Sequence, residues 1–308
     1  MQKRAPKAPS GHMSRLKPAE IDPLSEYGLP SKGDKRLQST RTQETYYAKI
    51  AERYLAFCTS AGDKDELLRQ FALLATSVAS VAPTPPPTPT TIKTTTSTIT
   101  STSATTTATK QDPNLSHILA ALRKLREGIV SSKRRDAFAV QVYLFAIRLG
   151  VLTSSHETYH PALLYLLRVI HPSHSLTSVE LSEVVGYLVL DAACRRGDLA
   201  EAFALRNRYK LRDKKIDGVL RALVRDDWVL WRRTRRMMDL YGATLMRAAE
   251  ADIRGHVLRA FGRAYLSVGL DFLEAQSMAG WEELREEYGV GWEMNGGRVV
   301  IRKIHGRS

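Results

Sequence analysis

The sequence is poor in cysteine, and this limits the kinds of site that it can hold. Only Cys58 and Cys194 occur in 308 residues, and neither has a companion at the spacing of a metal site. This argues against a disulfide scaffold, a Cys-rich zinc fold and Cys–His nucleophilic catalysis. It predicts a reducing compartment, cytoplasmic, nuclear or both.

Long apolar runs are also absent. The most apolar stretch, residues 137–153, is interrupted by Gln141 and Arg148, so we predict a buried helix rather than a membrane span. The N-terminus is basic but contains Pro6 and Pro9 and lacks an apolar segment, which is not the pattern of a secretory signal. No membrane partner is expected.

Familiar catalytic motifs are missing, with one apparent exception. The sequence has no G-x-S-x-G elbow and no Walker-type phosphate loop, but residues 156–160 match the H-E-x-x-H zinc-protease pattern. That chemistry needs His156 and His160 on one face of a continuous helix. Pro161 follows directly and favours a helix that starts there. We therefore predict a loop without metal at 156–160, and a protein that is not an enzyme and uses no cofactor or small-molecule substrate.

What the sequence has in excess is positive charge. The formal net charge is +14, which suits an acidic partner, either nucleic acid or an acidic protein surface. The alternative is that Lys and Arg simply solvate helix faces.

Composition divides the chain into five segments. Residues 1–39 are basic, polar and aperiodic, which predicts a disordered tail. Residues 40–80 carry two helical patterns, and 81–112 are a Thr/Pro-rich tract that we expect to be a disordered linker. Residues 113–238 are densely helical and predict a helical repeat. Residues 239–308 form the last predicted domain.

Two local signals mark helix boundaries within the helical repeat. Thr177 stands three residues before Glu180, which is a capping-box pattern at a helix start. The run Arg195-Arg196-Gly197-Asp198 is typical of one helix ending and another beginning.

The C-terminal segment predicts three helices followed by a two-stranded hairpin. Asn295-Gly296-Gly297 lies between two short runs with apolar residues, and Asn-Gly favours a hairpin turn because both central residues need positive φ. This order of elements is the outline of a winged helix. We predict a mainly α fold, a helical-repeat stack followed by a C-terminal winged helix with a β-hairpin.

The hairpin is also a candidate partner-binding edge. Alternation places Val299 and Ile301 on one face, toward the core, and Arg298, Val300 and Arg302 on the other. An exposed strand edge offers unpaired N–H and C=O groups for strand addition by a neighbouring subunit.

A second candidate surface is an arginine-rich helix beside Trp228 and Trp231. Arginine next to aromatic residues is compatible with RNA or an acidic partner. The competing interpretation places the tryptophans in the core and the arginines in solvent. The arginines concerned are Arg232, Arg233, Arg235 and Arg236.

From residues 196–203 onward, and again through 221–228 and 260–270, the chain resembles a known family. It is similar to the PCI-type group that contains subunit 8 of the COP9 signalosome, the small subunit of the proteasome lid and the k subunit of translation initiation factor 3. In this resemblance a helical repeat passes through a linking helix into a winged helix, and Gly291-Trp292 opens the wing. The winged-helix core would comprise Phe272, Leu273, Met278, Trp281, Leu284 and Tyr288.

The resemblance implies a non-catalytic scaffold subunit of a multiprotein complex, and its partners would be other PCI-type subunits. An alternative implied by relatives in messenger-RNA export is an RNA-binding adaptor that uses the basic helix and the winged helix.

Overall fold

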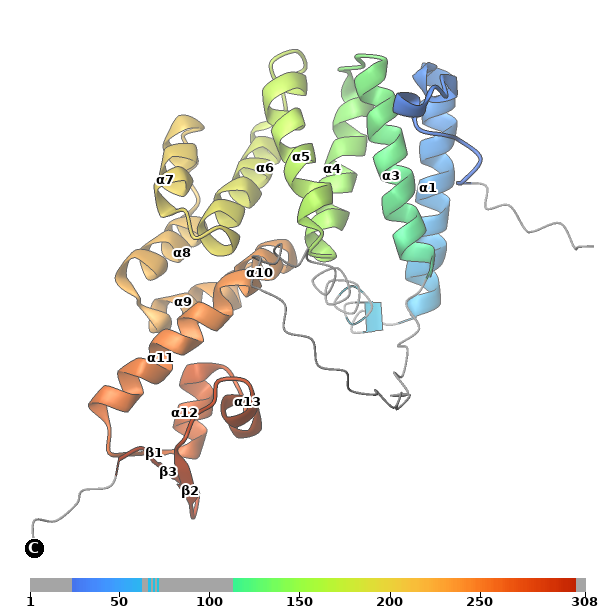
Figure 1. Ribbon diagram of the computed structural model, residues 1–308. Coiled ribbons are helices and arrows are strands. Elements are labelled where there is room, and N and C mark those ends of the chain that lie inside the picture. Colours follow the sequence, from blue (N-terminus) through green and yellow to red (C-terminus); the bar gives the residue numbers. More distant parts are fainter. Residues whose placement is uncertain (1–23, 63–65, 68, 70, 72–112, 303–308) are drawn as a thin grey trace, which may run out of the picture.

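The protein is mainly helical, a stack of helices followed by a C-terminal winged helix with a small antiparallel sheet (Figure 1). The structure, a computed structural model, describes residues 24–62, 66, 67, 69, 71 and 113–302. The predictions for residues 1–23, for most of the second N-terminal helix and for the Thr/Pro-rich tract lie outside the described residues.

The helices between residues 40 and 208 follow one another along a row in Figure 1, and consecutive helices of this row pack together. The last helix of the stack, at 240–246, turns back and packs on the helices at 137–152 and 178–190. In chain order they are the 3₁₀ turns η1 (Pro30–Lys32) and η2 (Arg36–Gln38), α1 (Thr40–Ala61), α3 (Pro113–Ser131), α4 (Ala137–Leu152), α5 (His156–Tyr165), the π-helical turn η3 (Leu166–Ile170), α6 (Ser178–Leu190), the π-helical turn η4 (Asp191–Arg195), α7 (Leu199–Arg208), α8 (Lys214–Arg225), α9 (Trp228–Met237), α10 (Leu240–Met246) and the 3₁₀ turn η5 (Arg247–Ala249).

In Figure 1 the winged helix lies below α8 and α9, on the side of the molecule away from α1. Its elements are α11 (Glu250–Ala264), β1 (Ser267–Gly269), α12 (Leu270–Ser277), α13 (Trp281–Glu286), β2 (Glu293–Asn295) and β3 (Arg298–Val300). The strand order is β1-β3-β2, with Val299 opposite both Val268 and Met294.

Residues 24–39 are not a disordered tail, and this part of the first predicted segment is wrong. Leu37 is fully buried in the core of the stack, and its carbonyl accepts a 2.9 Å hydrogen bond from the Gln43 side-chain amide. The Tyr46 hydroxyl donates to the Leu24 carbonyl at 2.7 Å. A few anchoring side chains therefore hold a segment that shows no periodicity.

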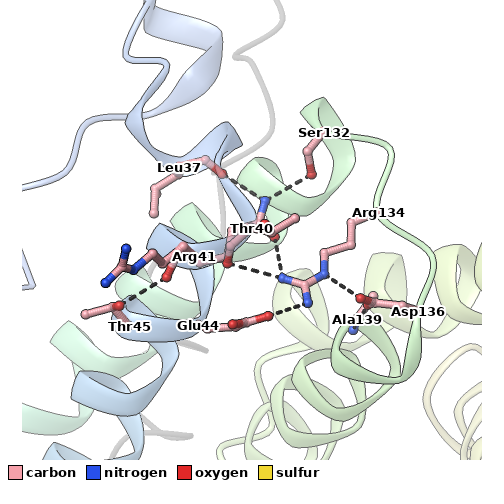
Figure 2. Close-up of polar contacts among 10 residues, drawn as sticks. Leu37, Thr40, Arg41, Glu44, Thr45, Ser132, Arg134, Asp136 and Ala139 are labelled. Carbon is pink, nitrogen blue, oxygen red and sulfur yellow. Dashed lines mark hydrogen bonds and ion pairs between the residues drawn. The ribbon is translucent and has the colours of Figure 1, made fainter.

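Helix α1 packs against α3 and shares one core with the rest of the stack. Arg134, between α3 and α4, fixes this junction (Figure 2): its guanidinium donates to Glu44 at 2.7 Å and to Asp136 at 2.8 Å, and also reaches the Thr40 carbonyl. The same group lies 4.1 Å from the Phe138 ring centroid. The N-terminal helix is thus part of the stack and not a separate unit.

The helix-boundary signals read from the sequence are confirmed. Thr177 and Glu180 form a complete capping box at the start of α6. Gly197 has φ +67°, and the Asp198 side chain caps α7. Residues 137–152 form the buried helix α4, which is capped by Asp136.

The expected loop at residues 156–160 is wrong, because α5 already begins at His156 and contains Pro161. Proline has no backbone N–H, so α5 lacks the hydrogen bond that residue 161 would donate to the carbonyl of residue 157. Both Glu157 and Pro161 are exposed, so water can solvate that carbonyl. A residue before proline is biased away from the α conformation, but this bias is overcome here by the packing of α5 on α4.

The boundary between stack and winged helix differs from the expected one at residue 239. Helix α10 lies within the stack, where Leu245 and Met246 are buried. Helix α11 is shared, since Ile253 belongs to the core of the stack and Phe261 to the separate core of the winged helix.

Candidate interaction surfaces

Strand β3 is the central strand of the winged-helix sheet, so the predicted edge at Arg298, Val300 and Arg302 is wrong. The sequence predicted a two-stranded hairpin, but β1 adds a third strand on the far side of β3. Val299 is fully buried, as predicted, and Ile301 packs against the same core. The turn is also confirmed, with positive φ at Gly296 and Gly297.

The arginines of the wing bond within the domain. Arg298 donates to the Ser267 hydroxyl at 3.2 Å, and Arg302 donates to the Arg263 carbonyl at 2.6 Å. These contacts tie β3 to β1 and to the end of α11, and Val300 is half-buried between its two neighbouring strands.

The edge strands are β1 and β2, and the fully exposed one is β2. Along β3, the Gly297 carbonyl accepts a hydrogen bond from the Leu270 N–H at 3.0 Å, and the Ile301 N–H donates to the Leu266 carbonyl at 2.8 Å. Both bonds are on the β1 side of the strand. Alternate residues of an antiparallel ladder bond to opposite sides, so Arg298 and Val300 bond toward β2.

Met294 stands opposite Val299 and therefore turns its own N–H and C=O away from β3. All three residues of β2 are exposed. This edge presents a backbone donor and acceptor at the outer limit of the sheet, and the sequence did not reveal it because it placed the edge on the wrong strand.

In the arginine-rich helix α9, two arginines make contacts within the fold and two are exposed. The Arg232 guanidinium bonds to the Ala275 carbonyl of α12, and Arg235 pairs with Glu250 of α11. Arg233 and Arg236 are exposed and have no partner among the described residues. Trp231 is fully buried and Trp228 half-buried, so the core interpretation of the tryptophans holds.

Helix α13 of the winged helix is acidic. Glu282, Glu283 and Glu286 are exposed and Arg285 is the only basic residue of α13. A carboxylate-rich face repels the phosphate backbone that dominates nucleic-acid affinity.

The buried Arg254 of α11 fixes how α12 and α13 sit on the domain. Its guanidinium donates to the Ser277 carbonyl at 3.0 Å and to the Tyr288 hydroxyl at 2.7 Å, and pairs with Glu283 at 2.8 Å. Of the predicted core, Leu273, Trp281 and Leu284 are buried, and Met278 and Tyr288 are partly buried. Phe272 is not: 48% of its surface is exposed.

Of the two histidines of the H-E-x-x-H pattern, His160 belongs to a structural cluster and His156 does not. His156 is exposed, whereas His160 Nδ1 lies 3.1 Å from a carboxylate oxygen of the fully buried Asp191. Among the described residues, no group of three or more His, Cys, Asp or Glu side chains is arranged to hold a metal. Burial raises the pKa of the Cys194 thiol to about 12, so it is a thiol rather than a reactive thiolate.

Two open clefts in the stack are lined by ionisable groups that already have structural partners. One, of about 420 Å³, contains Glu183, and the other, of about 520 Å³, contains Arg148; these two residues pair with each other through two 2.8 Å bonds. The other carboxylates of the first cleft, Asp213 and Asp239, cap α8 and α10. Glu183 and Arg148 are therefore engaged with each other, and both capping carboxylates with helix N-termini.

Comparison of the chain with protein-family profiles and with curated proteins finds no match to either. Among the helices in the described part of the chain, none has both the length and the apolar character needed to cross a bilayer.

Proposed function

We propose that this protein is a non-catalytic assembly subunit of a multiprotein complex, in the cytosol, the nucleus or both. The observation that carries the proposal is the open β2 edge on a winged helix, on the side of the molecule away from α1 (Figure 1). Such an edge is a template for an added strand of another protein. The likeness to PCI-type subunits of the proteasome lid, the COP9 signalosome and initiation factor 3 makes another PCI-type subunit the proposed partner.

The rest of the molecule supports a scaffold role. The described clefts hold satisfied ion pairs and capping carboxylates, and Cys194 is an unreactive thiol. Helix α11 contributes buried side chains to both cores and so connects the wing to the stack. An assembly subunit needs such a connection between its stack and its binding edge.

The test is the Met294→Pro variant, expressed in place of the native chain, with partners identified by affinity purification and mass spectrometry. Proline removes the outward N–H and leaves the bonds between β2 and β3 in place, because edge strands tolerate proline on the solvent side. We expect an unchanged melting temperature and loss of partners.

Met294→Ala is the matched control, since it removes the side chain and keeps the N–H. Val300→Pro, in contrast, removes an inward donor of the central strand and should destabilise the sheet itself. Partners retained at native levels by a folded Met294→Pro variant would rule out strand addition at β2.

An RNA-binding adaptor is the second candidate, and one observation favours it: Arg233 and Arg236 are exposed, in a chain of net charge +14. The acidic α13 opposes a role for the winged helix in such binding. RNA contacts through arginine give a binding constant that falls steeply with salt, by about 0.7 in log–log slope per phosphate on a single strand. A flat salt dependence, or binding unaffected by Arg233→Ala with Arg236→Ala, would exclude this use of α9.

A further inference from the structure

A groove of about 420 Å³ lies where the stack meets the winged helix, between α9, α11 and α12. Its walls are mostly apolar, and the polar side chains that line it are those of Arg232 and Gln276. The bond from Arg232 to the Ala275 carbonyl joins two of its walls. The apolar lining residues are Trp228, Val229, Ala260, Phe261, Ala264, Tyr265 and Phe272.

Three large apolar side chains of the groove are exposed. Val229, Tyr265 and Phe272 show 54%, 42% and 48% of their surface, although each comes from a different part of the chain. Single exposed apolar residues are common, but a gathering of three around a concavity marks a binding surface. The groove thus presents an apolar binding surface in the fold as it stands.

The charge around this surface is positive. Helix α9 continues past Val229 with Arg233 one turn on and Arg236 a further turn on, both exposed and without a partner among the described residues. Arg232 lines the groove itself. The nearest acids along the chain are Asp227, which caps the start of α9 just before Trp228, and Asp271, which lies about 100° around α12 from Phe272.

We propose that this groove binds a short acidic amphipathic helix of a partner protein. Its apolar face would pack on Val229 and Phe272, and its carboxylates would meet the arginines of α9. This is the helix-in-groove mode, in which apolar anchors give affinity and charge gives selectivity. The site is separate from the β2 edge and adds a second partner surface to the proposed function.

The chemistry of the walls favours peptide over RNA. Single-stranded RNA binds through stacking on aromatic faces and through phosphate contacts along a groove. Of the four aromatic lining residues, Phe261 is buried and Trp228 half-buried, so Tyr265 and Phe272 are the exposed ones. Aliphatic Val229, Ala260 and Ala264 form the rest of the apolar wall. The apolar face of a peptide helix needs neither base-stacking partners nor hydrogen-bonding groups in the wall.

The test measures fluorescence anisotropy of a labelled, designed helical peptide that has leucines at i, i+3, i+4 and i+7 and glutamates elsewhere, added to the full chain. We expect a micromolar Kd. Val229→Ala with Phe272→Ala should weaken binding roughly tenfold or more, and Arg233→Ala with Arg236→Ala should weaken it and reduce its salt dependence. The matched control is Leu55→Ala, which removes a side chain that is 65% exposed on α1 and should leave binding unchanged, as should Met294→Pro.

Three results would overturn the proposal. The first is no binding of the glutamate peptide. The second is equal binding of a peptide in which lysines replace the glutamates. The third is an oligouridylate that binds more tightly than the peptide and loses affinity on the same groove substitutions, which would make the groove an RNA site.

Discussion

Asp191 should be among the most sensitive single positions in the stack. It begins the π-helical turn η4, is fully buried, and accepts hydrogen bonds from the Tyr159 hydroxyl at 2.6 Å and from Arg195 at 2.6 and 3.0 Å. His160 and Arg196 also approach it, at 3.1 and 3.6 Å. Asp191→Ala would leave several donors on two helical elements without an acceptor.

The expected loss follows from this geometry. Removing one member of a buried ion pair costs about 3–5 kcal/mol, but Arg195 and Arg196 keep 32% and 30% of their side-chain surface exposed. Water can therefore take up part of the lost interaction, and we expect the lower end, about 3 kcal/mol. For a chain of this size that is a fall of about 6–12 °C in melting temperature. Asp191→Asn keeps one acceptor oxygen and should lose less, about 1–2 kcal/mol.

The same site predicts a pH dependence. Burial by itself raises the pKa of the Asp191 carboxyl, but hydrogen bonds from Arg195 and Tyr159 outweigh it, so the pKa lies below its ordinary value. A carboxyl with a lowered folded-state pKa stabilises the protein above its unfolded pKa of about 3.9. That contribution is lost as the pH falls through the folded-state pKa.

Urea and thermal unfolding of the native chain, Asp191→Asn and Asp191→Ala should be followed by circular dichroism at several pH values. The difference in the free energy of unfolding between the native chain and Asp191→Asn should be largest at pH 7, and it should decrease as the pH falls from about 5 to about 2. A gap below about 1 kcal/mol at pH 7, or one that stays constant on acidification, would refute the reasoning.

Three further predictions concern other parts of the stack. Gly128→Ala should cost about 1–3 kcal/mol, because its Cβ would lie 2.7 Å from the Leu37 carbonyl oxygen; a melt with limited proteolysis of residues 24–39 checks this. His160→Ala should cost about 1 kcal/mol, since it removes a bond to a buried carboxylate, whereas His156→Ala should cost nothing measurable, and neither should alter metal content by mass spectrometry. Deleting residues 82–111 should leave the melting temperature nearly unchanged, because a Thr/Pro-rich tract buries little apolar surface; a fall of several degrees would contradict it.

Elements with strong local chemistry were predictable from the sequence. The capping box at Thr177, the break at Gly197 and the turn at Gly296 each rest on a requirement that few residue types satisfy. The core of the winged helix was largely predictable because large apolar residues recur at helical spacing.

Features set by tertiary contacts were not predictable. Strand β1 is three residues long, too short for alternation to show, and without it β3 looked like an edge. Leu37 is one apolar residue in a polar segment and is held by α3, far along the chain. Phe272 has the residue type of a core position, but the helix that carries it turns it toward the groove. Pro161 was given too much weight as a helix start.

Because α11 contributes to both cores, we expect the stack and the winged helix to unfold as one cooperative unit. At 1.5 Å per residue the 15 residues of α11 span about 22 Å. If the winged helix unfolded, Phe261 would lose its packing neighbours, although it lies on the same helix as Ile253, which is buried in the core of the stack. A partner that binds only the folded wing stabilises it by mass action. That free energy is not confined to the wing, and amide hydrogen exchange as distant as α10 and η4 should slow when the partner is bound.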